Sequence, residues 1–191
     1  MRHAWKRYLL CASVAAAFAP LAATQEVTAK RANEMTLARL RPGHSSLANA
    51  NSLYGEKRRL APSNDGRLWT WIDPCARRKL RVEADEQGLI QTLTVSSEDA
   101  ASDCRRRASD PAASASWKTG RGLSLGDPIQ KVAELYGPAN STSPSVRGAR
   151  ELELLFYAFD WAGSEVPQVM EVTCDRTSGV VVEITLAFPS L

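Results

Sequence analysis

The fold is decided by two stretches that share one pattern, LANANSLYG at residues 47–55 and IQKVAELYG at residues 129–137. Each spaces its apolar residues like one face of a helix and ends in Leu-Tyr-Gly, where the glycine suits the left-handed backbone that ends many helices. Each is followed later by two strand-like segments joined by a turn, Asp85 to Gly88 and Asp175 to Gly179. The sequence therefore predicts a duplicated unit in which a short helix precedes an antiparallel sheet.

Residues that commonly start helices precede both stretches. Ser45 or Ser46 is expected to cap the first helix, and Asp127 to cap the second, with Pro128 at its first helical position. Each helix is expected to end at its tyrosine and to bury one apolar face.

Strand candidates lie between the helices and turns, and they cover residues 67–72, 79–84, 89–95, 151–159, 169–174 and 180–187. The serine-rich stretches at 96–116 and 139–149 are expected to be a boundary region and a loop. The predicted fold class is α+β. It has two tandem units, residues 34–110 and 111–191, each a short helical segment packed on an antiparallel three- or four-stranded sheet.

The first 29 residues have the composition of an export signal. Arg2, Lys6 and Arg7 precede an apolar, alanine-rich run, which is too short and too interrupted by proline to favour a spanning helix. Cleavage is expected after Ala23 or Ala29. The mature protein is therefore predicted to be periplasmic or secreted, with no stable membrane insertion after cleavage.

Charge says little about partners once the signal is removed. The formal net charge of +3 includes the three signal cations, so the mature chain is close to neutral and no nucleic-acid partner is expected. Basic clusters at 57–59, 77–81 and 105–107 leave a polyanion-binding module as an alternative. Acidic residues adjoin the second and third clusters, which favours ordinary solvated surface charge.

Cysteine positions suggest one disulfide. Export places the chain in an oxidising compartment, and Cys75 and Cys104 flank the first hairpin, so these two are the expected pair. Cys174 lies at an inward strand position and is expected to be a buried, reduced thiol.

Residue patterns that carry chemistry are scarce. His44 is the only histidine beyond the signal, and it has no cysteine or histidine at metal-ligand spacing. Neither a nucleophile elbow nor a glycine-rich phosphate loop occurs in the sequence. The sequence predicts no catalytic residues, no metal and no cofactor, with an unrecognised envelope enzyme as a further alternative.

Strand alternation predicts a binding surface instead. The phase that turns Leu68 and Ile72 inward leaves the tryptophans between them outward, and a matching phase in the strand candidate at 151–159 leaves its last two aromatics outward. Large aromatics beside charges are typical of interaction surfaces. The predicted partner-binding residues are Arg67, Trp69, Trp71, Arg81, Leu155, Tyr157 and Phe159. The reverse phase, which would bury the rings, is the alternative.

A family resemblance agrees with this function. The stretch LSLGDP at 123–128, continued to Tyr-Gly-Pro at 136–138, and more loosely residues 40–55 resemble the beta-lactamase-inhibitor-like fold, which is shared with the SmpA/OmlA group of small bacterial envelope proteins. The resemblance covers most of residues 36–188. It implies an exported, non-catalytic protein that binds another protein through its sheet or loops. The lipid-anchoring cysteine of outer-membrane members is absent, and nothing matches the inhibitory loops.

Overall fold

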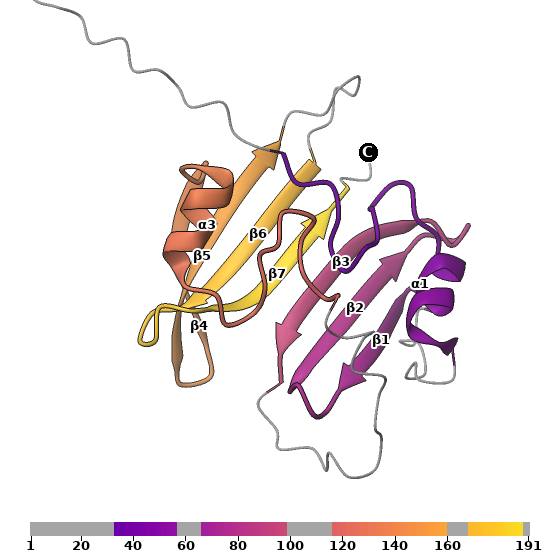
Figure 1. The fold of residues 1–191 in the computed structure, drawn as a ribbon, viewed down its shortest axis with the longest axis horizontal. Coiled ribbons are helices and arrows are strands. Elements are labelled where there is room, and N and C mark those ends of the chain that lie inside the picture. The colour runs from indigo at the N-terminus through magenta and orange to yellow at the C-terminus, as the bar shows by residue number, and fades with distance from the viewer. Residues whose placement is uncertain (1–32, 57–65, 99–115, 160–167, 189–191) are drawn as a thin grey trace, which may run out of the picture.

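One antiparallel sheet dominates the computed structural model, which describes residues 33–56, 66–98, 116–159 and 168–188 (Figure 1). The strands follow one another across the sheet in the order β1-β2-β3-β7-β6-β5-β4. Along the chain the elements are α1 (Leu47–Tyr54), β1 (Leu68–Asp73), β2 (Arg78–Ala84), β3 (Ile90–Ser97), α3 (Ile129–Tyr136), β4 (Ser141–Arg147), β5 (Arg150–Phe159), β6 (Gln168–Asp175) and β7 (Val181–Ala187).

The prediction of two tandem helix-on-sheet units is wrong, because both halves of the chain contribute to a single seven-stranded sheet and the protein is mainly β. β3 and β7, the last strands of the two halves, pair with each other, so that Leu93 faces Leu186 and Val95 faces Ile184. A strand left at an edge exposes unpaired backbone groups. Pairing β3 with β7 removes two such edges and joins the halves at the centre of the sheet.

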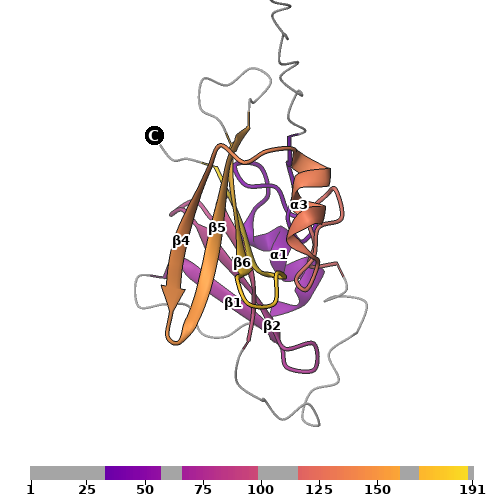
Figure 2. The ribbon, with the colours of Figure 1, turned by 90° about the vertical axis from the view of Figure 1, so that its left-hand side faces the viewer.

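Both short helices lie on the same side of the sheet, which we call the inner face (Figure 2). Ser46 caps α1 in a reciprocal capping box with Asn49. The predicted Asp127 cap of α3 is wrong, since Pro128 occupies that position and makes no side-chain cap bond. The Asp127 carboxylate instead accepts hydrogen bonds from the Ser124 amide (2.7 Å) and the Lys131 ammonium (2.8 Å).

β4 falls where a loop was expected. It lies at one edge of the sheet, and all seven of its residues are exposed. Its serine-rich sequence buries no apolar face, and Pro144 cannot donate a backbone hydrogen bond, which only an edge strand tolerates. The strand forms because β5 supplies a full set of pairing partners along its length.

The core lies between the inner face and the helices, and it corrects the predicted strand phase. Trp71, Tyr157 and Phe159 are about 1% exposed, and Leu155 is buried with them. The rings pack against the helix-end tyrosines, with Trp71 beside Tyr54 and the other two beside the tyrosine of α3. The aromatics face inward because they fill more volume under the helices than the aliphatic residues between them.

Two β-bulges explain a further phase error. The register of β2 with β3 shifts at Glu83 and Ala84, and that of β6 with β7 shifts at Thr173 and Cys174. Each bulge moves the following strand by one residue. Ile90 and Val181 are therefore the buried residues, where the sequence predicted Leu89, Val180 and Val182. Within the described part of the chain, no helix has both the length and the apolar character needed to cross a bilayer.

Candidate functional site

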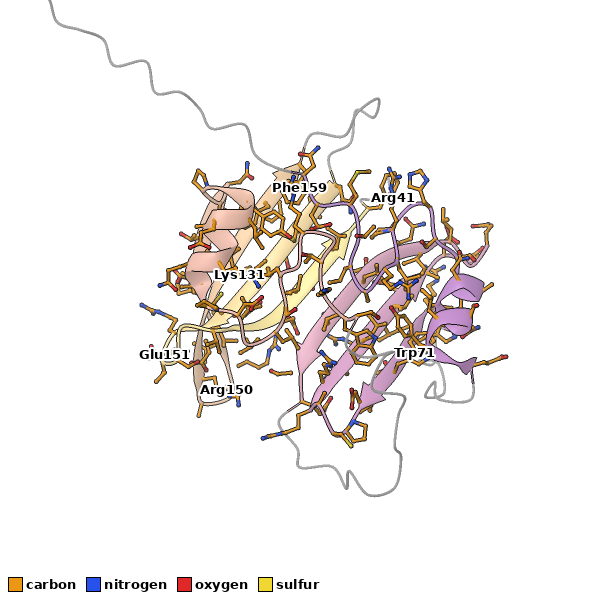
Figure 3. All side chains as sticks on the ribbon, in the orientation of Figure 1. Arg41, Trp71, Lys131, Arg150, Glu151 and Phe159 are labelled. Atoms are coloured by element: carbon orange, nitrogen blue, oxygen red, sulfur yellow. The ribbon has the colours of Figure 1, made fainter. Side chains whose placement is uncertain are left out.

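The predicted aromatic surface is not formed. Trp71, Leu155, Tyr157 and Phe159 belong to the core, and Trp69 is half-buried against it. Figure 3 shows Trp71 in the half of the sheet near α1 and Phe159 in the half near α3. Exposed Arg67 pairs with Glu86 at 3.0 Å. Of the seven predicted residues, Arg81 is the one that the structure places on the opposite, outer face of the sheet, in a polar cavity.

The outer face carries rows of polar residues across its central strands. In one row Lys79 of β2, Ser96 of β3 and Glu183 of β7 lie directly opposite one another. In the next row Arg81 continues to Thr94 and Thr185, whose hydroxyl oxygens are 3.1 Å apart. Side chains opposite each other in an antiparallel sheet are in contact range, so the two rows form one polar surface.

A cavity of about 530 Å³ opens on this surface. Its lining comes from β2, from β7, from the C-terminal end of β3 with the residue that follows it, and from the end of β4. The lining residues are Lys79, Arg81, Ser96, Ser97, Glu98, Arg147 and Glu183. We call it the outer-face cavity.

Ion pairs order the charged groups of the cavity. The Arg147 guanidinium donates two hydrogen bonds to the Glu183 carboxylate, at 2.9 and 3.1 Å. Arg81 contributes a third, longer contact to Glu183 at 3.5 Å. Glu183 is only 13% exposed, so these cations offset the cost of removing its charge from water. Across the cavity, the Lys79 ammonium lies 3.3 Å from the Glu98 carboxylate.

Arg147 reaches the cavity from the edge of the sheet. β4 and β7 are separated by three strand spacings, or about 14 Å in a flat sheet, and a long arginine side chain covers much of this distance. Figure 2 shows the β4–β5 hairpin inclined to the outer side of the sheet, away from the helices. The tip of the hairpin, marked by Arg150 and Glu151 in Figure 3, therefore borders a hollow on the outer face.

Two polar groups of the cavity lack a hydrogen-bond partner among the described residues, the Ser96 hydroxyl and Glu98 Oε2. Glu98 still has the Lys79 ammonium at 3.3 Å, whereas Ser96 is 1% exposed and lies between Lys79 and Glu183 in the sheet with no partner for its hydroxyl. Burying a hydroxyl without a partner costs about 1 to 3 kcal/mol. A buried hydroxyl in this state is available to a water molecule or to a polar group of a ligand in the cavity.

A second polar cluster lies on the helix side, around the buried carboxylate of Glu34, and both carboxylate oxygens are hydrogen-bonded. They accept hydrogen bonds from the backbone amides of Met35, Thr36 and Gly120 and, at 3.1 Å, from the Arg121 amide. The Tyr136 hydroxyl completes the set at 2.7 Å, and burial raises the pKa of this tyrosine above its usual range. The cluster ties the segment before α1 to α3 and is structural.

The remaining predicted residues make no further site. The thiol of Cys174 is free and buried, and burial, with a smaller contribution from Glu153, raises its pKa to about 11. His44 is exposed in a turn. Cys104 lies outside the described residues, so its pairing with Cys75 stays a prediction. Among residues 33–56, 66–98, 116–159 and 168–188, no three histidine, cysteine or acidic side chains cluster as metal ligands would.

The basic cluster at residues 77–81, the one that lies within the described residues, does not form a single surface. Arg78 lies on the inner face, where its guanidinium stacks 5.6 Å from the Trp117 ring. Lys79 and Arg81 alternate to the outer face, and each has an acidic partner there. The basic clusters at 57–59 and 105–107, like the export signal at 1–29, lie outside the described residues.

The sequence missed most of the cavity. Arg81 is among the predicted binding residues, whereas Arg147 lies in the stretch predicted to be a loop (139–149) and Ser96 in the predicted boundary region (96–116). The alternation of Val95 with its neighbours was the signal that could have placed Ser96 outward.

Comparisons with known proteins identify no family for this chain. No family model and no curated protein matches the chain. The chain is similar to the crystal structure of a DUF4309 family protein, YjgB, from Bacillus subtilis, with 11% sequence identity and a TM-score of 0.44. The match covers 82% of this chain and 88% of that chain. The resemblance to beta-lactamase-inhibitor-like and SmpA/OmlA proteins stays a prediction.

Proposed function

We propose that this protein is an exported, non-catalytic module that binds another protein through the concave outer face of its sheet. Export rests on the signal-like first 29 residues. The site differs from the one that the sequence predicted, because the predicted aromatics are in the core and the outer-face cavity takes their place.

One observation carries the proposal: neither described helix covers the outer face, and that face holds a cavity with ordered charges (Figure 2). A sheet that buries one face and leaves charged groups in a concavity on the other has the form of a recognition surface. Arg81 and Arg147 are 39% and 60% exposed, so a partner can reach both. Arginine is enriched at protein interfaces because its planar fork pairs with carboxylates and backbone oxygens.

A polyanion-binding module is the weaker candidate. Nucleic acids and acidic polysaccharides bind to continuous basic surfaces. In this protein the described basic cluster is divided between the two faces of the sheet, and Lys79 and Arg81 already face glutamates. An envelope enzyme has no specific observation in its favour.

Capture from an envelope extract tests the proposal. The wild type is compared with a double variant, Arg81→Ala with Arg147→Ala, which removes two cations from the outer face. The matched control is Arg67→Ala with Arg176→Ala, which removes two exposed arginines that pair with glutamates elsewhere. We expect proteins that the wild type and the control retain to be lost from the outer-face variant.

Fold must be checked in parallel, by far-UV circular dichroism and thermal unfolding of all three proteins. If the two double variants fold alike and retain the same proteins as the wild type, the outer face is not the binding surface.

A further inference from the structure

We infer that the outer-face cavity binds a carboxylate group on an acidic segment of the partner protein, held by Arg81, Lys79 and the Ser96 hydroxyl. This inference rests on the proposed function, and it adds the chemistry of the ligand group. Three independent observations support it: an unsatisfied hydroxyl, the sign of the cavity charge, and the size of the space.

Ser96 supplies the first observation. Ser96 lines the cavity, and its hydroxyl is shielded from solvent and has no hydrogen-bond partner among the described residues. The residues opposite it in the sheet, Lys79 and Glu183, are themselves engaged in ion pairs. A hydroxyl can donate a short hydrogen bond to a carboxylate oxygen. A carboxylate in the cavity would give Ser96 the partner that it lacks.

The charge of the lining gives the second observation. Lys79, Arg81 and Arg147 carry three positive charges, whereas Glu98 and Glu183 carry two negative ones. Glu183 is already contacted by both arginines, so its charge is compensated within the protein. The surplus charge is positive, which favours an anionic ligand group over a lysine or arginine side chain.

Arg81 is the cation best placed to receive the ligand. Among the described residues, its acidic partner is Glu183, at the long distance of 3.5 Å. A guanidinium has five N–H donors in a planar fork, so most of its donors are left for a carboxylate. Arg147, in contrast, already uses two nitrogens on Glu183 at short distances.

The volume gives the third observation. A cavity of about 530 Å³ has the size of pockets that hold small ligands. It has room for one acidic side chain or a chain terminus, while the rest of an extended partner segment lies along the concave face.

Short peptides provide the test. Amide chemical shifts of the isotope-labelled mature protein are followed by NMR at low ionic strength, where screening is weak. The probes are acetyl-tetraglutamate amide, acetyl-tetralysine amide and acetyl-tetraglutamine amide. We expect the glutamate peptide alone to shift the amides of Lys79, Arg81, Ser96 and Glu183, with millimolar affinity.

Ser96→Ala separates binding from stability. Removal of an unsatisfied buried hydroxyl is expected to leave the thermal midpoint unchanged or raised, whereas affinity for the glutamate peptide falls about tenfold. Arg81→Ala is expected to weaken binding by at least as much. Arg176→Ala, which removes an exposed cation outside the cavity, is the matched control and is expected to bind like the wild type.

Several results would overturn the inference. If the lysine or glutamine peptide also shifts the amides of the cavity residues, the cavity does not select a carboxylate. If the glutamate peptide causes no shifts at millimolar concentrations, the cavity is not a carboxylate site. Equal affinity of wild type and Ser96→Ala would remove the serine from it. If partner capture is still lost in the Arg81 and Arg147 double variant, the outer face keeps its proposed function and only the carboxylate site fails.

Discussion

Arg147, at the tip of the β4–β5 hairpin, clasps Glu183 of β7 across two intervening strands with two hydrogen bonds of 2.9 and 3.1 Å. The pair connects the edge of the sheet to its centre over the outer face. It brings a cation from an otherwise fully exposed strand into the cavity.

Loss of the Arg147–Glu183 ion pair is expected to make local opening of the β4–β5 hairpin more frequent. In Arg147→Ala the amides of β4 should exchange with solvent faster, while those of β2 and β3 stay protected. Global stability should fall by no more than about 1 kcal/mol, because Arg147 is largely exposed. Hydrogen exchange measured by mass spectrometry checks this, with Arg176→Ala as the control. Unchanged exchange in β4 would show that backbone pairing alone holds the hairpin.

Glu34→Gln is expected to destabilise the fold by about 2 kcal/mol. The glutamine amide would direct N–H groups at the Arg121 amide, which now donates to a carboxylate oxygen at 3.1 Å. Urea unfolding at neutral pH measures the loss. Glu134→Gln, on the exposed side of α3, should stay within about 0.5 kcal/mol of wild type. Equal effects of the two substitutions would mean that the Glu34 cluster contributes nothing special.

Cys174 is expected to make the fold sensitive to alkali. Burial raises the pKa of its thiol from 9.0 to about 11. Above pH 9 the unfolded chain therefore loses a proton that the folded protein keeps, and stability falls until the pH reaches about 11. Buried tyrosines also contribute in this range, so the comparison must be made with Cys174→Ala. A difference in unfolding free energy between the two proteins that does not change from pH 8 to pH 11 would contradict the assignment.

The disulfide prediction is tested by peptide mapping without reduction. We expect a peptide that joins Cys75 to Cys104, and alkylation of Cys174 only after denaturation, since that thiol is free and buried. Closing the loop of roughly 30 residues between Cys75 and Cys104 contributes about 3.5 kcal/mol to the free energy of unfolding in the chain-entropy model. Reduction should therefore lower stability by a similar amount. A cross-linked peptide containing Cys174 would be incompatible with this pairing.

Local signals predicted most helices and strands. Ser46, the tyrosine at each helix end and the glycines after them act within a few residues, so their effect can be read without knowledge of the fold. The strand boundaries that rest on alternation and Gly-ended turns are also close to those observed. β4 was missed because its strand state depends on the neighbouring strand and not on its own composition.

The binding surface could not be predicted because two strands are apolar on both faces. LWTWI at 68–72 and LELLFYAF at 152–159 satisfy either phase, and the choice is made by the space under the helices. Pairing of β3 with β7 likewise joins residues such as Thr94 and Thr185, 91 positions apart, which no local pattern specifies. The cavity depends on both, so its residues came together only in the folded sheet.

The central pairing of β3 with β7 also sets the order of events during biosynthesis. Ribosomes release β3 well before its partner β7, which is the last of the described strands. Until β7 emerges, one edge of β3 and half of the apolar inner face have no partner, and such nascent surfaces are prone to aggregate. Contacts of such long sequence separation favour slow folding, so the exposed edge of β3 persists at least until β7 has been synthesised.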